Sequence, residues 1–232
     1  MDAVVMAAGL GTRLRPLTER WAKPVLPIDG RPVIAVLLRE LAAAGCGRVW
    51  VVTGHLAEQV ERLVGDGSVF GVGVQFVRQP EALGSADAVQ RALDGGVELP
   101  AVVSAADTAF TAGDVGRFAR AFAESRAAGA VAVRTDPAPG PGRVGVRVSE
   151  GRVERFGDDD PGNPWSGAPL WGLDRPVADR LMLDSPPFEL EKAYAAAIAA
   201  GEAVIAVEIA KTRDLTYPLD LVEENFSYLR ST

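Results

Sequence analysis

The first half of the chain alternates short apolar runs with amphipathic segments, and this alternation limits the possible folds more than any other feature of the sequence. The apolar run at residues 3–8 is typical of a buried strand, whereas Ile34, Leu37 and Leu41 recur at helical spacing. Strands and helices that alternate in this way form a mostly parallel sheet with helices on both faces. The pattern predicts strands at residues 3–8, 49–54, 72–79 and 101–107 and helices at residues 32–44, 57–64, 85–93 and 115–128.

The second half of the chain has a different pattern. Two apolar segments, residues 144–148 and 153–156, flank a Ser-Glu-Gly turn and predict a hairpin. The predicted fold class is therefore α/β: a three-layer, Rossmann-like mixed sheet, mostly parallel, with helices on both faces and a small hairpin insertion. The further elements that we expect are a strand near residues 168–172, a helix near 189–200, a strand at 203–209 and a final helix at 219–229.

Length and composition predict a globular chain. Apolar residues make up 48% of the 232 residues, and no apolar run is long enough to cross a bilayer. The Pro- and Gly-rich segment at residues 136–143 is expected to be a loop between strands, so residues 1–232 are predicted to form a single domain. The lone Cys46 is expected to be a buried, inert thiol. Because no secretory signal pattern follows Met1, we expect a cytoplasmic protein with no membrane partner.

A basic, glycine-rich loop follows the first predicted strand. The formal net charge of −7 disfavours a nucleic-acid partner, so this local positive charge suits a small anion. Gly9 and Gly11 let the backbone turn sharply and bring its N–H groups close to that anion, and Arg13, Arg15 and Lys23 add charge nearby. The loop therefore predicts a binding site for a polyphosphate.

A longer pattern around this loop is more specific. The chain reads Ala-Ala-Gly-x-Gly-Thr-Arg-Leu-x-Pro-Leu-Thr from Ala7 to Thr18, and Lys-Pro-x-Leu-Pro-Ile from Lys23 to Ile28. No P-loop string occurs, and Leu14 stands where a dinucleotide-binding fingerprint needs a small residue. The pattern instead resembles the signature of the sugar-1-phosphate nucleotidylyltransferases. This resemblance implies an enzyme that uses Mg²⁺ to transfer a nucleoside monophosphate from a nucleoside triphosphate to a sugar 1-phosphate, with release of pyrophosphate.

The resemblance also implies roles for residues on the nucleotide side. Arg13 is expected to hold the departing β- and γ-phosphates, and Lys23 the α-phosphate or the pyrophosphate bridge. The string from Gln79 to Ser85 is similar to the segment with which the family contacts the base, and a side-chain amide can donate to and accept from a pyrimidine edge. We therefore expect UTP or dTTP to be preferred over purine triphosphates. The residues expected to bind the nucleotide are Ala8, Gly9, Gly11, Thr12, Gln79, Gly84 and Ser85.

Two acids that are distant in sequence are candidate metal ligands. Asp107 ends a predicted strand, and from the residues alone it could instead cap the following segment. The string that begins at Asp214 resembles the closing motif of the family, and the resemblance pairs Asp107 with Asp214 as ligands of one Mg²⁺ ion. Asp220 is expected in the first turn of the last helix, where a carboxylate complements the helix dipole.

The acceptor side departs from the family pattern. Many relatives have Glu-Lys-Pro where this chain reads Glu-Arg-Phe at residues 154–156, so the charge is kept but its geometry differs. The acidic run at residues 158–160 is either a solvated loop or a group that repels a dianionic acceptor or attracts a cationic one such as phosphocholine. The residues that the resemblance places at the sugar phosphate are Gly145, Glu154, Arg155, Ser166 and Gly167.

Two alternative functions share parts of this pattern. A cytidylyltransferase acting on choline phosphate or inositol phosphate would have the same loop and acid pair but another acceptor pocket. A catalytically silent regulatory subunit would share the fold alone, and such subunits usually lose the loop arginine or the metal acids, which are present here. The single histidine, His55, is expected to be structural, because the nucleophile of such a transferase is already an anionic phosphate oxygen.

Overall fold

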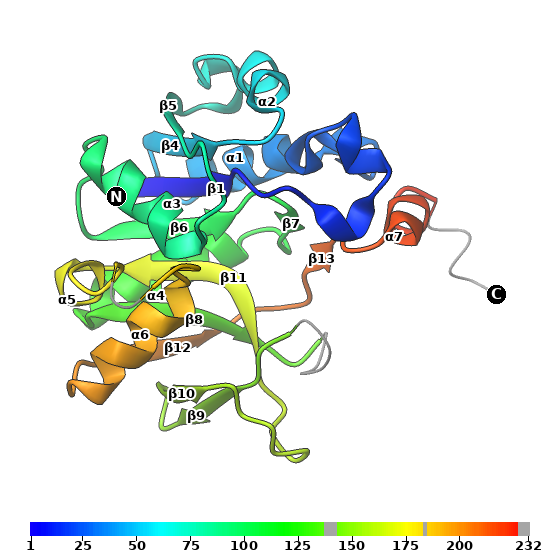
Figure 1. Cartoon of the computed structure of the whole chain (residues 1–232). Coiled ribbons are helices and arrows are strands. Elements are labelled where there is room, and N and C mark those ends of the chain that lie inside the picture. The colour runs from blue at the N-terminus through cyan, green and yellow to red at the C-terminus, as the bar shows by residue number, and fades with distance from the viewer. Residues whose placement is uncertain (137–142, 183–184, 227–232) are drawn as a thin grey trace.

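The computed structural model of the chain describes residues 1–136, 143–182 and 185–226. Its centre is a nine-stranded mixed sheet in the order β5-β4-β1-β6-β11-β8-β12-β10-β9 (Figure 1). Two small sheets, β7 with β13 and β2 with β3, lie outside it. The strands are β1 (Asp2–Ala7), β2 (Pro27–Ile28), β3 (Arg31–Pro32), β4 (Arg48–Thr53), β5 (Gly73–Arg78), β6 (Ala101–Ala105), β7 (Thr108–Ala109), β8 (Gly129–Arg134), β9 (Val146–Ser149), β10 (Arg152–Phe156), β11 (Ser166–Leu173), β12 (Val204–Glu208) and β13 (Arg213–Asp214).

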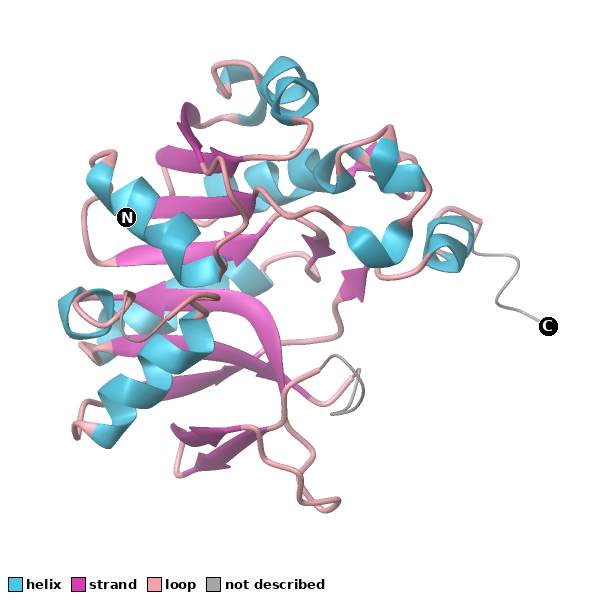
Figure 2. Ribbon diagram, in the orientation of Figure 1, coloured by secondary structure: helices cyan, strands magenta, loops and turns pink. Residues whose placement is uncertain are grey.

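Helices cover both faces of the large sheet, so the fold has three layers (Figure 2). One face packs against α1, α2 and α4 through a core that includes Leu38 and Phe118, and the other packs against α3, α5 and α6 through a core that includes Val89 and Tyr194. None of the helices in the described ranges is both long and apolar enough to span a membrane. The helices are α1 (Val33–Ala43), α2 (Ala57–Val64), α3 (Ser85–Asp94), α4 (Asp114–Ser125), α5 (Arg175–Ala178), α6 (Leu190–Ala199) and α7 (Pro218–Glu223).

The directions of the strands position the site. β1, β4, β5, β6, β8 and β12 run in one direction, whereas β10 and β11 run in the opposite direction. The carboxyl ends of these parallel strands therefore lie along one edge of the sheet, where ligands bind in sheets of this kind. The predicted fold class is confirmed, including the hairpin of β9 and β10.

The structure also contains a strand that the sequence analysis did not predict. β8 lies inside the sheet between β11 and β12, and every residue in it is buried. Its Gly-Ala-Val-Ala-Val run is short and consists of small residues, so it has no polar alternation that distinguishes a strand from the end of the preceding helix. At the other end of the chain, α7 ends at Glu223, earlier than expected. Residues 227–232, and residues 137–142 of the predicted loop, lie outside the described ranges.

Candidate active site

At one position of the loop after β1, the backbone conformation and the space available fit only glycine. Gly11 has φ near 60°, and a Cβ atom there would lie 2.8 Å from the Cγ2 atom of Thr18. The Thr18 hydroxyl donates a hydrogen bond of 2.8 Å to the Gly11 carbonyl oxygen, which closes the turn. Three short 3₁₀ helices, Thr12–Leu14, Leu17–Glu19 and Lys23–Val25, follow along the loop. The turn therefore directs Arg13 and Lys23 toward the edge of the sheet.

Side chains from the end of β4 and from α2 hold this loop in place. The Nε2 atom of His55 lies 2.8 Å from the Thr18 carbonyl oxygen. Gln59 accepts a hydrogen bond from the backbone N–H of Ala22 and donates one to the carbonyl oxygen of Arg20, both 2.8 Å long. The structure thus gives His55 a contact that supports the loop, in keeping with the structural role expected for it.

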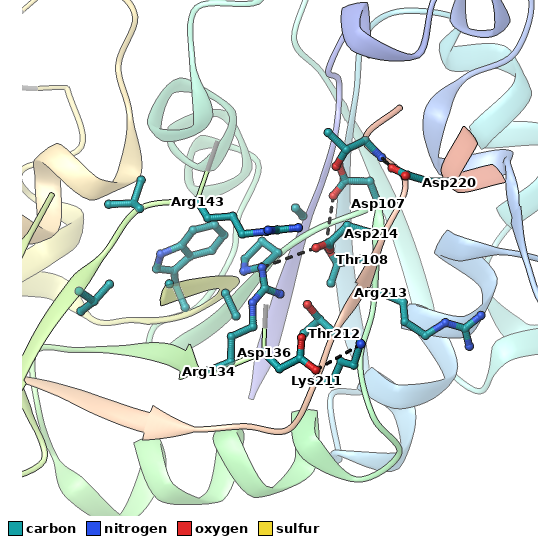
Figure 3. A pocket seen from close by; sticks show the side chains of 18 of the residues that line it. Asp107, Thr108, Arg134, Asp136, Arg143, Lys211, Thr212, Arg213, Asp214 and Asp220 are labelled. Atoms are coloured by element: carbon teal, nitrogen blue, oxygen red, sulfur yellow. Dashed lines mark hydrogen bonds and ion pairs between the residues drawn. The ribbon is translucent and has the colours of Figure 1, made fainter. Parts of the chain in front are cut away.

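Two cavities open along the carboxyl edge of the sheet. The first, which we call the loop cavity, has a volume of about 420 Å³ and is lined by the loop after β1 and by the segment before α3. The second, the β8 cavity, has a volume of about 650 Å³ and is lined by β8, β11 and the segment around β13 (Figure 3). Both cavities include Arg13, Lys23, Ala105, Asp107 and Thr216 in their walls, so they meet at a strongly charged junction.

The structure brings the residues predicted to bind nucleotide into the wall of one cavity. Ala8, Gly9, Gly11, Thr12, Gln79, Gly84 and Ser85 all line the loop cavity.

Hydrogen bonds within this wall fix the amide of Gln79. Its Nε2 atom donates to the Gly84 carbonyl oxygen at 3.0 Å and to the Asp87 carboxylate at 2.7 Å. Because both partners are acceptors, the orientation of the amide is determined and both of its N–H donors are used. Among the described residues no hydrogen bond is made to the Oε1 atom of Gln79, so the side chain has an acceptor but no donor left for a ligand. This corrects the expectation that the amide would do both.

One acid of the loop cavity was not predicted from the sequence. The Glu189 carboxylate, at the start of α6, accepts hydrogen bonds from the hydroxyl of Ser85 at 2.5 Å and from its backbone N–H at 3.3 Å. Gly84 lies so close to this segment that a Cβ atom would be 2.1 Å from the carbonyl oxygen of Phe188. Glu189 follows a segment without clear periodicity, and only the close approach of these two chain segments brings it to the site.

The two predicted metal ligands lie next to each other on the small sheet of β7 and β13. Asp214 pairs with Thr108 in that sheet, and Asp107 directly precedes Thr108. The Thr108 hydroxyl donates to the Asp214 carboxylate at 2.7 Å, and the Lys23 ammonium forms an ion pair with Asp107. Burial raises the pKa of the Asp214 carboxyl, although the charge of Arg134 and the Thr108 hydrogen bond act in the opposite direction.

These two carboxylates suit a magnesium ion. The described residues contain no group of three or more His, Cys, Asp or Glu side chains that could hold a metal. Mg²⁺ is usually bound by one or two carboxylates and takes its remaining ligands from water and substrate phosphates. Asp107 lies in the wall that the two cavities share, Asp214 lies beside it in the wall of the β8 cavity, and both are partly exposed, so the pair matches that donor set.

Arg134 is a second residue that the sequence analysis missed. It is the last residue of β8, only 3% of it is exposed, and it lines the β8 cavity. Its Nη2 atom lies 3.5 Å from the Asp214 carboxylate, and Figure 3 shows the two side chains pointing toward each other. Burial lowers the pKa of the guanidinium, and the charge of Asp214 partly offsets this. Arg134 ends a strand on the edge of the sheet where ligands bind in folds of this kind, but the sequence analysis did not single it out because β8 was not predicted.

Of the residues predicted at the sugar phosphate, only Gly167 lies among the described residues that line the two cavities. Gly145 and Ser166 form a bridge between their backbones beside the β8 cavity, and a Cβ atom at Gly145 would lie 2.2 Å from the carbonyl oxygen of Asp158. Glu154 is exposed on β10, outside both walls. The structure therefore does not bring Glu154 to the junction.

Arg155 is bound by the acidic run instead. Asp158 has a fully buried side chain, which accepts from Arg155 at 2.6 Å and pairs with Arg147 at 2.9 Å. Burial opposes the charge of Asp158, but the hydrogen bond from Arg155 and the charge of Arg147 hold the pKa of its carboxyl below the ordinary value. Asp160 also pairs with Arg147. Asp158 is therefore neither part of a solvated loop nor a free charge facing the acceptor. Its carboxylate instead binds two arginines of the hairpin.

Comparison with known proteins identifies the family. A family model described as nucleotidyl transferase matches residues 2–158. The chain belongs to this family. Among curated relatives, a glucose-1-phosphate thymidylyltransferase from Streptomyces antibioticus is 43% identical over 89 residues, which are 38% of this chain and 25% of the relative. The match thus spans about a quarter of the length of that relative. The resemblance to sugar-1-phosphate nucleotidylyltransferases is confirmed by these findings.

Solved structures of similar fold belong to nucleotidyltransferases of more than one kind. A Bacillus anthracis protein, described as a candidate glucose-1-phosphate thymidylyltransferase, matches with a TM-score of 0.85 at 20% identity, over 100% of this chain and 96% of its own. The inositol-1-phosphate CTP transferase from T. maritima matches with a TM-score of 0.82 at 21% identity, over 99% and 96%. At these identities the likeness establishes the nucleotidyltransferase fold.

Proposed function

We propose that this nucleotidyltransferase transfers a nucleoside monophosphate from a nucleoside triphosphate to a sugar 1-phosphate, giving a nucleoside diphosphate sugar and pyrophosphate. The observation that carries the proposal is the meeting of the two cavities at Arg13, Lys23 and Asp107. In an in-line displacement the attacking and leaving oxygens lie on opposite sides of one phosphorus atom. Two cavities that share a charged wall can hold the two substrates on those opposite sides.

The loop cavity receives the nucleoside triphosphate in this proposal. The backbone of Gly9, Gly11 and Thr12 offers N–H groups to the phosphates, and Arg13 holds the departing β- and γ-phosphates. The free Oε1 atom of Gln79 accepts from an N–H group on the base edge. The N3–H group of uracil or thymine meets this requirement, which supports UTP or dTTP as the donor.

The chemistry requires no protein nucleophile, because an oxygen of the acceptor phosphate attacks the α-phosphorus. Lys23, now paired with Asp107, exchanges this partner for the α-phosphate when the nucleotide binds. It then stabilises the charge that develops between the α- and β-phosphates, while Arg13 stabilises the leaving pyrophosphate. The contribution of the protein is thus positioning and electrostatic stabilisation.

Asp107 and Asp214 would hold the magnesium ion, which when bound neutralises charge on the reacting phosphates. The acceptor enters the β8 cavity, whose wall combines the cations Arg134 and Arg143 with the aromatic ring of Trp171. The arginines of this wall suit the phosphate of an acceptor, and the Trp171 ring suits its sugar or alcohol ring. Gly167 contributes backbone to the same wall.

A grid of substrates tests the proposed function. Pyrophosphate release is measured with five nucleoside triphosphates, UTP, dTTP, CTP, GTP and ATP, each against hexose 1-phosphates, choline phosphate and inositol phosphate in the presence of Mg²⁺. We expect turnover with UTP or dTTP and a hexose 1-phosphate. Asp107→Asn serves as the inactive control. Absence of pyrophosphate release across the whole grid would refute the proposal and favour a catalytically silent protein of the same fold.

A cytidylyltransferase acting on inositol phosphate or choline phosphate is the second candidate. It is supported by the similarity in fold to the T. maritima inositol-1-phosphate CTP transferase. The exocyclic amino group of cytosine can also donate to the Oε1 atom of Gln79. Preferential use of CTP with an alcohol phosphate in the same grid would establish this alternative.

A further inference from the structure

The guanidinium group of Arg134 is almost completely buried but has few partners. Its side chain is 4% exposed, and its Nε and Nη1 atoms make no hydrogen bond to any described residue. The contact with Asp214, 3.5 Å from Nη2, is longer than a normal hydrogen bond, and the other carboxylate oxygen of Asp214 already accepts from Thr108. Arg134 therefore has donors that the described protein does not use.

A neighbouring arginine in the same cavity wall shows what a structural arginine looks like here. Arg213 donates through Nε to Glu224, through Nη1 and Nη2 to Asp29, and through Nη2 to the Glu224 carbonyl oxygen. Each of its nitrogen atoms thus has a partner, and together they join β13 to the β2–β3 turn and to the end of α7. The Arg134 side chain is more deeply buried, 4% exposed against 30% for Arg213, and its Nε and Nη1 atoms lack such partners among the described residues.

A buried cation with unused donors is costly unless a ligand completes its hydrogen bonds. The ligand must be anionic to offset the charge, and the planar guanidinium matches the oxygens of a phosphate or carboxylate. Arg134 lines the β8 cavity and is absent from the described wall of the loop cavity. The anion it meets is therefore on the acceptor side and not part of the nucleotide.

We propose that Arg134 binds the phosphate group of the acceptor in the β8 cavity and thereby selects phosphate monoesters as acceptors. This inference rests on the proposed function, since it names the residue that holds the second substrate. Arg134 lies at the end of β8, a strand buried on both sides within the sheet, so its backbone is held rigidly. Its position beside Asp214 places the acceptor phosphate next to the junction where Arg13 and Lys23 meet the nucleotide.

Binding measurements test this inference without requiring turnover. Isothermal titration calorimetry compares glucose 1-phosphate with glucose on the wild type, Arg134→Gln, Arg134→Lys and the control Arg152→Gln, which changes an exposed arginine of the hairpin. The proteins are saturated with Mg²⁺ and a non-hydrolysable UTP analogue. Binding of that analogue and the melting temperature report whether each variant is folded with an intact loop cavity.

We expect the wild type to bind glucose 1-phosphate and not glucose. Arg134→Gln should weaken binding of glucose 1-phosphate by about 10- to 100-fold, the range for losing charge-assisted hydrogen bonds. Arg134→Lys should lie in between, because it keeps the charge without the planar donors, and Arg152→Gln should match the wild type. All variants should bind the UTP analogue with similar affinity.

Three results would overturn the inference: wild-type affinity for glucose 1-phosphate in folded Arg134→Gln or Arg134→Lys, equal binding of glucose and glucose 1-phosphate, or no binding of glucose 1-phosphate by the wild type. If Arg134→Gln does not fold, Arg134→Lys decides. Phosphate-dependent binding through Arg134 without pyrophosphate release in the substrate grid would support this inference and refute the proposed function. If the Arg134 variants turn over a hexose 1-phosphate as fast as the wild type does, the proposed function is supported and this inference is refuted.

Discussion

Replacing Asp214 with asparagine tests the acid pair, because the structure predicts the direction in which the stability of the metal-free protein changes. The Asp214 side chain is 23% exposed, and burial raises its pKa even though Arg134 and Thr108 favour the charged form. The folded state therefore disfavours the carboxylate relative to the unfolded chain. Asparagine keeps the shape and an oxygen that can accept from Thr108. Asp214→Asn should thus leave metal-free stability unchanged or raise it by up to about 1 kcal/mol, about 2–4 °C in Tm.

The pH dependence of this effect has a definite direction. A carboxyl whose pKa is raised on folding destabilises the protein at pH values above its ordinary pKa, and this cost is absent once the group is protonated in both states. The advantage of Asp214→Asn should therefore be present at neutral pH and disappear as the pH falls below about 4, the ordinary pKa of aspartate. Thermal unfolding of the two proteins in metal-free buffer over this pH range measures it.

Magnesium and UTP should reverse the order of stability. A ligand present at about 100 times its Kd stabilises the folded state by about 2.7 kcal/mol, which corresponds to roughly 5–11 °C in a protein of this size. The wild type should show this shift, whereas Asp214→Asn should lose most of it together with its turnover. The assay is thermal unfolding with and without both ligands, followed by pyrophosphate release at saturating Mg²⁺.

Asp114→Asn is a matched control, because Asp114 is a buried carboxylate with complete partners. It accepts from the backbone N–H of Ala210 at 2.8 Å and pairs with Arg117 at 2.8 Å. Its replacement should cost about 1–3 kcal/mol, because one of these donors would face an amide N–H group, while the ligand-induced shift persists. Wild-type turnover in Asp214→Asn would refute the two-acid metal site. A loss of stability equal to that of Asp114→Asn would refute the argument from burial.

Three further predictions follow from the loop cavity. Lys23→Ala should lower kcat by at least about tenfold, as expected for losing a phosphate contact, and its melting temperature shows whether loss of the Asp107 ion pair also affects the fold. UTP or dTTP should be used in preference to purine triphosphates, because the resemblance to the family places Gln79 at the edge of a pyrimidine; steady-state kinetics that favour ATP or GTP by about tenfold, about 1.4 kcal/mol, would contradict that role. Gly11→Ala should destabilise the protein by about 1–2 kcal/mol, owing to its positive φ and the contact with Thr18, whereas Gly9→Ala, whose Cβ would meet no atom within 4 Å, should be nearly neutral in thermal unfolding.

The sequence determined the elements whose signal is local. The helices of the first half have apolar stripes at helical spacing, and the strands between them are apolar runs bounded by turns, so their positions followed from periodicity. The loop from Ala7 to Thr18 was predicted to bind phosphate from its residue types and their spacing alone. Asp107 and Asp214 were paired by resemblance to a family pattern, and the register of β7 with β13 then placed them side by side.

Only the tertiary structure decided which polar groups are already satisfied. Gln79 has the same amide in any context, but the packing of Gly84 and Asp87 around it uses both donors and leaves one acceptor. Arg155 and Asp158 carry charges that could serve a substrate, yet they neutralise each other. Arg134 shows the opposite case, because it is buried at the end of an unpredicted strand and its Nε and Nη1 atoms find no partner among the described residues. Hydrogen-bond partners come from segments far apart in sequence, so a linear pattern names the groups while the fold decides which remain free to act.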